Sequence, residues 1–250
     1  ANRGTASVGF GLDSQAVGDF SVVSGGSTNV VDANYSSILG GIYNKINSTS
    51  DYSVICGGGD TLSVPSPSNG NIIEGGSDSS CIVGGYSNKM NSGATSSCIV
   101  GGVANIINSA NCNIGGGARN TISMTGLPQA QGASSIGGGS DSNINSENCH
   151  IGGGLGNNIG VASKGGHIGG GAGNVIAGSS IYSTIPGGLQ CQINSNNNGC
   201  FVWSGGSITD GILTATTASR QCIMRCSNNT LVSNGGSVPA LPGFYFLTTN

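Results

Sequence analysis

Two histidines, nine cysteines and ten carboxylates are the side chains of this 250-residue chain that could do chemistry. Imidazoles bind transition metals and titrate near neutral pH, and His150 and His167 each directly precede an isoleucine. They are therefore candidates for a metal site or a pH-sensitive contact, although polar surface positions are the favoured interpretation. No Cys-x-x-Cys spacing occurs, and Cys222-x-x-x-Cys226 alone does not indicate zinc. The sequence predicts no catalytic residue, no cofactor and no metal centre.

Glycine-rich segments such as "SSILGGIYNKI" (36–46) raise the question of phosphate binding. A phosphate-binding loop needs one glycine-rich turn ahead of a helix N-terminus, with a Lys-Ser/Thr pair. Neither this segment nor its sister segments have that context, so the glycines are predicted to be structural. The carboxylates show no shared position, whereas a glycoside-cleaving enzyme needs two at a fixed separation. We predict that the protein is not an enzyme, with a glycan-cleaving fibre enzyme as an alternative.

One template, small-x-I-x-G-G-x-x-N-x-I, recurs along the chain and must supply the elements that position these groups. Its period of mostly 15 to 18 residues is too short for helix pairs or propeller blades and fits coils of two short strands. Alternation along a strand turns the aliphatic residue and the small residue two positions earlier into one thin core. The predicted aliphatic column is Val23, Ile38, Ile55, Ile73, Ile82, Ile99, Ile114, Ile136, Ile151, Ile168, Ile185 and Trp203.

The asparagine position of the template forms a second column. Stacked in successive coils, these amides can hydrogen-bond along the ladder and also tolerate a left-handed turn. We predict a structural role rather than a row of sugar or metal contacts. The glycines are expected to supply positive φ at the turn and close backbone approach. The column is Asn29, Asn44, Asn88, Asn105, Asn120, Asn157 and Asn174, with Ser79, Ser142 and Cys191 as departures.

The cysteines divide by their place in the template. Cys112 and Cys149 take the inward small position in coils that are two apart, about 9 to 10 Å, so they are expected to be buried free thiols. Cys81 and Cys98 directly precede the aliphatic column in neighbouring coils, about 5 Å apart, where a disulfide is conceivable. An odd total leaves at least one cysteine unpaired or used between chains. Mostly reduced cysteines, and hence cytoplasmic assembly, is the favoured interpretation.

The repeat ends near Gly206, and a different pattern follows. Cys222, Met224 and Cys226 alternate as in a strand, before breaks at Pro239 and Pro242. A solenoid needs a cap because its last coil exposes an unpaired ladder, so we predict a β-roll domain at 1–206 and a cap or trimerisation segment at 207–250. Aromatic residues near this end are interpreted as a hydrophobic plug, with a receptor-binding patch as the alternative: Phe201, Trp203, Phe244, Tyr245 and Phe246.

Composition excludes several classes of protein. Only 7% of residues are charged and the net charge is −3, so no nucleic-acid partner is expected. No run of 18 apolar residues occurs, so we expect a soluble chain without membrane insertion. With 48 glycines and 5% aromatic residues, a thick layered core is excluded. The predicted fold is all-β, a parallel β-roll or β-solenoid of about twelve coils with a β-rich C-terminal cap.

The ladder resembles the head domain of the trimeric autotransporter adhesins (YadA-like), in the variant form found in phage and large-virus fibre proteins. Gly4, Gly11, Gly18 and Gly25 are spaced by seven, and "SQAVGDFSVVSGG" places Ala16 and Val23 in that family's half-coil. The resemblance covers about residues 4 to 206 and rests on the many repetitions. The segment "ATTASRQCIMRCSNN" is similar to the β-rich caps that follow such rolls in viral fibres.

The resemblance implies a left-handed roll and a homotrimer, displayed on a surface for attachment to a host-cell glycan or receptor. On a threefold axis, His150 and His167 could gather six imidazoles. No heptad stalk, neck motif or membrane anchor follows the head, and nine cysteines are unusual for a chain threaded through an outer membrane. We therefore expect a virion-surface fibre or capsid-surface protein, with a bacterial cell-surface adhesin head as an alternative. An ice-binding solenoid would need a regular threonine array, which only "TATT" (214–217) approaches.

Overall fold

The computed structural model describes residues 4–59, 69–124, 132–205, 214–226, 229–233 and 245–248. All regular elements in these ranges are β-strands, most of them two residues long. The chain forms two compact units: residues 1–122 with 127–133, and residues 123–126 with 134–250. We refer to them as unit 1 and unit 2.

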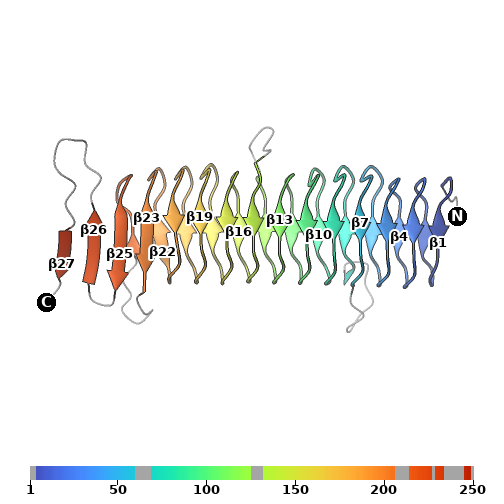
Figure 1. Ribbon diagram of the computed structural model, residues 1–250, viewed down its shortest axis with the longest axis horizontal. Helices are drawn as coiled ribbons and strands as arrows, with labels where there is room; N and C mark the ends of the chain where they lie inside the picture. The colour runs from blue at the N-terminus through green and yellow to red at the C-terminus, as the bar shows by residue number, and fades with distance from the viewer. Residues whose placement is uncertain are drawn as a thin grey trace. The chain divides into compact units, whose positions relative to one another are not determined.

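Unit 1 is a parallel β-solenoid in which each coil contributes one strand to each of two rows (Figure 1). Strands of a row pair in register with the strand one coil later. The first row is β1 Val8–Gly9, β3 Val22–Val23, β5 Ser37–Ile38, β7 Val54–Ile55, β9 Cys81–Ile82, β11 Cys98–Ile99 and β13 Asn113–Ile114. The second row is β2 Gln15–Ala16, β4 Val30–Val31, β6 Lys45–Ile46, β8 Ile72–Ile73, β10 Lys89–Met90, β12 Ile106–Ile107 and β14 Thr121–Ile122.

Unit 2 repeats this arrangement and ends in an antiparallel segment. Its parallel first row is β15 Ser135–Ile136, β17 His150–Ile151, β19 His167–Ile168, β21 Thr184–Ile185, β23 Phe201–Ser204 and β25 Cys222–Cys226. Its second row is β16 Asn143–Ile144, β18 Asn158–Ile159, β20 Val175–Ile176, β22 Cys191–Ile193 and β24 Thr214–Ala215. After β25, the strands β26 Asn229–Ser233 and β27 Tyr245–Thr248 pair antiparallel, which fits the predicted β-rich cap.

The core is a double column of aliphatic side chains. In almost every coil the second residue of each strand points inward, and its exposed fraction is 0% from Val23 through Ile185 in the first row. Ile46, Met90 and Ile107 fill the opposite wall at 0% exposure. The predicted all-β solenoid with two short strands per coil is therefore confirmed.

Two members of the predicted column were assigned wrongly. Ile73 lies in the second row, because β8 pairs with β6 and β10. The nine residues from Ile73 to Ile82 are thus half a coil, and the inserted segment 60–68 had hidden this. In β23, Thr184 is in register with Phe201, so Val202, 0% exposed, continues the column and Trp203 faces outward. Cys200 then takes the buried small position of this coil.

The asparagine column is a buried hydrogen-bond ladder, as predicted. The Asn88 amide nitrogen donates to the Gly84 and Gly102 carbonyl oxygens at 3.0 and 2.9 Å. The Asn88 side-chain oxygen accepts the Asn105 backbone N–H at 3.0 Å. Asn71, rather than Ser79, fills this position beside the insertion. Each amide therefore satisfies backbone groups of two coils that would otherwise be buried without partners.

The asparagines themselves do not adopt the left-handed conformation that the sequence led us to expect. The residue before each asparagine does so instead, for example Tyr43 at φ 59° and Ala104 at φ 55°. The two glycines of a pair also differ. Gly85 has φ +78°, and a Cβ there would lie 2.0 Å from the Gly102 carbonyl oxygen, whereas a Cβ on Gly84 would meet nothing within 4 Å. Only the second glycine is required by the backbone.

This difference predicts opposite outcomes for two neighbouring substitutions. Gly85→Ala should lower the free energy of unfolding by more than about 1–2 kcal/mol, because left-handed strain adds to the overlap with the next coil. Gly84→Ala should be neutral or stabilise by up to about 1 kcal/mol, because it restricts the unfolded chain. Chemical denaturation of both variants measures this, and equal destabilisation would contradict the assignment.

Candidate functional site

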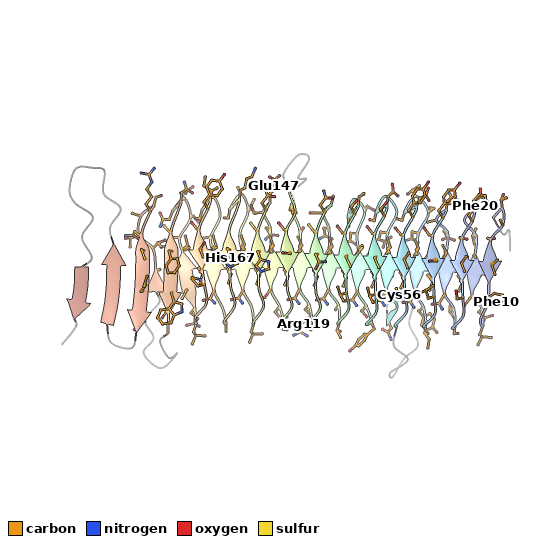
Figure 2. All side chains as sticks on the ribbon, viewed as in Figure 1. Phe10, Phe20, Cys56, Arg119, Glu147 and His167 are labelled. Carbon is orange, nitrogen blue, oxygen red and sulfur yellow. The ribbon has the colours of Figure 1, made fainter. Side chains whose placement is uncertain are left out.

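Three aromatic rings form an exposed stack on one turn edge of unit 1, which we call the aromatic ladder (Phe20, Tyr35 and Tyr52). Neighbouring ring centroids lie 5.1 Å apart, with interplanar angles of 9° and 6°. The side chains are 49%, 52% and 62% exposed, and Figure 2 shows Phe20 at this outer edge. Each ring sits directly before an inward serine, so stacking of the coils stacks the rings.

The aromatic ladder is held in an unfavourable backbone conformation. The three residues have φ of 54°, 51° and 60°, a region that bulky side chains rarely occupy. Serine occupies the same left-handed position in the next two coils, at Ser79 and Ser96. Aromatic residues are thus not needed to make this turn. An exposed, strained and repeated aromatic side chain indicates a role in contact with another molecule rather than in the fold.

A column of carboxylate and amide side chains runs beside the aromatic ladder. The Asn34 side-chain oxygen accepts the Asp19 N–H at 2.8 Å, and the Asp51 carboxylate accepts the Asn34 N–H at 2.8 Å. Asp78 accepts the Asp51 N–H at 2.9 Å in the same way. The expectation that the carboxylates share no position is therefore wrong for Asp19, Asp51 and Asp78. One oxygen of each carboxylate is committed to the backbone, which favours a structural role.

The repeated tripeptide that builds this edge is readable in the sequence: "DFS" at 19–21, "NYS" at 34–36 and "DYS" at 51–53. The sequence reasoning missed it because only the inward positions of the template were compared. Its spacings of 15 and 17 residues equal the coil period, which is the signal that could have found it.

The two histidines come together as predicted, but not as a metal centre. His150 and His167 are in register on β17 and β19, with ring centroids 5.2 Å apart and an interplanar angle of 18°. Nearly parallel rings at this spacing do not converge their nitrogens on one ion, which needs about 2.0–2.1 Å to each. The Ser135 hydroxyl lies 2.8 Å from Nδ1 of His150. Among the described residues, no group of three or more His, Cys, Asp or Glu could hold a metal ion.

The other predicted site residues fall in three places. Cys81 and Cys98 are in register on β9 and β11, and both are free thiols. Trp203 is partly exposed on β23 and is not part of the buried core. Tyr245 and Phe246 lie in β27, known only from its backbone, and Phe244 lies outside the described residues, so the plug and the receptor patch stay predictions. Cys112 and Cys149 are buried free thiols, as expected.

Comparison with known proteins gives no family for this chain. No protein-family model matches it, and no curated protein matches it. Within the described ranges, no helix is long and apolar enough to cross a membrane. The geometry of the chain itself therefore has to carry the functional argument.

The histidine pair predicts a pH-dependent stability. Burial, and next the nearby His150, lower the pKa of His167 below its usual value of about 6.5. The unfolded state then binds more protons, so stability is complete above about pH 6.5 and falls as the pH drops through the lowered pKa. Melting temperature compared at about pH 7.5 and 5.5 should show this loss, and His167→Asn should reduce it. An unchanged pH dependence in that variant would contradict the assignment.

Proposed function

We propose that this protein is the non-enzymatic head of a surface fibre or adhesin, assembled as a homotrimer, that attaches to a host cell or particle surface. A virion-surface protein is favoured over a bacterial adhesin head, because nine cysteines suit assembly in a reducing compartment. The proposal rests on one observation, which is the ordering of large apolar side chains outside a core that is complete without them.

Those outward side chains form a row on the glycine edge of unit 1, which we call the apolar row (Phe10, Leu39, Val83 and Val100). Each directly follows the first-row strand, and the exposed fractions are 62%, 51%, 43% and 47%. Cys56 takes the equivalent position after β7. A soluble protein rarely leaves such a contiguous row uncovered. A closed symmetric assembly would cover the same row in every subunit.

The aromatic ladder supports attachment as a separate task. Figure 2 shows Phe10 and Phe20 at opposite edges of unit 1, so association through the apolar row leaves the aromatic ladder free. Three copies would present three aromatic ladders, and simultaneous contacts raise overall avidity without requiring strong single contacts. A host-surface glycan or receptor is the ligand that we propose for this edge.

The alternative functions have less support. A glycan-cleaving enzyme would need a carboxylate pair across a cleft, whereas Asp19, Asp51 and Asp78 lie along a turn edge and bind backbone N–H groups. An ice-binding face would need aligned threonines. The outward strand positions of the described coils are instead mixed, with Val22, Lys45 and Asn113 among them.

Light scattering tests the assembly. The expected mass in solution is about 73 kDa, three times the 24.4 kDa of the chain. Leu39→Lys combined with Val100→Lys should yield a folded monomer, because charges would face one another in the covered row. Val161→Lys, on an exposed turn outside the row, is the matched control and should remain trimeric. A well-folded monomeric wild type would overturn the trimer.

A host-glycan array tests attachment. The wild-type protein should bind a defined subset of glycans, and Tyr35→Ser should lose that binding because it interrupts the aromatic ladder. Serine occurs naturally at this turn in Ser79 and Ser96, so the variant should keep its fold and mass. Tyr182→Ser, an isolated exposed tyrosine of unit 2, serves as the control and should bind normally. Binding that survives Tyr35→Ser would remove the aromatic ladder from the proposal.

A further inference from the structure

Three cysteines lie in successive coils on one face of unit 1. Cys81 and Cys98 are directly paired residues of β9 and β11. Cys56 follows β7, the strand that pairs with β9 on its other side. By strand alternation all three side chains are directed away from the aliphatic column, and all three are partly exposed. Stacking has therefore brought three thiols together that lie 25 and 17 residues apart in the sequence.

The central thiol contacts both of the others. Cys81 lies within hydrogen-bonding reach of the Cys56 and Cys98 thiols. Burial first, and then its two thiol neighbours, raise the pKa of Cys81 to about 11, and burial also raises the pKa of Cys98. The thiols are therefore protonated at neutral pH and slow to react. They can stay reduced in a reducing compartment and react after transfer to an oxidising one.

Strand register decides which two cysteines suit a disulfide. Directly paired residues of adjacent strands lie about 4.7–4.9 Å apart, inside the Cα range that a disulfide spans. Cys81 has this relation to Cys98. Towards β7, the residue directly paired with Cys81 is Val54, so Cys56 is displaced by two positions along the strand. A bond from Cys56 to Cys81 would be strained and easily reduced, although its sulfur reaches Cys81.

We propose that Cys81 and Cys98 form a reversible disulfide that joins neighbouring coils, and that Cys56 is the thiol that reopens it. A small disulfide such as glutathione disulfide is the oxidant. One cysteine thiolate attacks it and releases one glutathione; the second cysteine thiolate then displaces the other glutathione, closing the Cys81–Cys98 bond. The two thiol protons end on the two glutathione molecules, so glutathione disulfide is reduced as the protein is oxidised.

Reopening uses the same row of sulfurs. The Cys56 thiolate attacks the Cys81 sulfur and expels the Cys98 thiolate, which takes up a proton. The resulting strained Cys56–Cys81 bond is then reduced by glutathione in two exchange steps that return both thiols and yield glutathione disulfide. This inference does not depend on trimer formation or on attachment.

Peptide mapping after trypsin cleavage distinguishes the two disulfides. Trypsin cuts after Lys45, Lys89 and Arg119, so Cys56 and Cys81 share peptide 46–89 and Cys98 lies in peptide 90–119. After treatment of the whole chain with glutathione disulfide, the two peptides should be joined, and the intact protein should be about 2 Da lighter. Cys98→Ser should abolish the joined peptide. Serine is found at this strand position in Ser37 and Ser135, so the variant should fold.

Two further variants make the assignment decisive. Peptide 90–119 also contains Cys112, whose burial behind the strand predicts that Cys112→Ser leaves the joined peptide unchanged. Cys56→Ser should still form the joined peptide but should lose it more slowly in reduced glutathione than the wild type does. Loss of the joined peptide in Cys112→Ser, or nine free thiols after oxidation of the folded wild type, would overturn the disulfide. Equal reduction rates with and without Cys56 would overturn its role.

Discussion

The close approach of successive coils at the second glycine of each pair is the constraint on which this structure depends. A Cβ on Gly85 or Gly102 would lie 2.0 or 2.1 Å from a carbonyl oxygen of the next coil. That proximity lets one buried asparagine amide reach carbonyl oxygens on two coils at once, as Asn88 does. A core only two aliphatic side chains thick can then be stable, because its backbone polar groups are satisfied by the ladder rather than left buried.

In-register stacking also explains why chemistry appears on the outside as rows. Each sequence position is repeated at almost the same place one coil later, so a residue type that recurs with the coil period becomes a line of contacts. The aromatic ladder, the carboxylate column, the paired histidines and the three thiols are all products of this rule. A helix or an antiparallel sheet would scatter the same residues over different faces.

The inward half of the fold could be predicted from the sequence because its pattern is nearly invariant. Isoleucine, asparagine and small residues recur at fixed offsets from the glycine pairs, and the coils follow from them. Ile73 was misplaced because an insertion made half a coil resemble a whole one, and Trp203 because an aromatic residue stood where Val202 continues the column. The outward rows were harder to predict. The thiol of Cys56 meets Cys81 only through side-chain lean across a two-position offset, which spacing alone does not reveal.

The difference between the two units bears on where partners can bind. In unit 2 the positions equivalent to the apolar row are Gly137, Gly152, Gly169 and Pro186. A Cβ on these three glycines would meet a carbonyl oxygen at 2.4, 2.3 and 2.2 Å, so the backbone there leaves no room for a side chain. The bare edge of unit 2 is therefore imposed by its coil geometry. Unit 1 adopts a turn that accommodates Leu39, Val83 and Val100, and its exposed apolar side chains are free to differ. Such side chains, not required by the turn that bears them, are where selection for a partner can act.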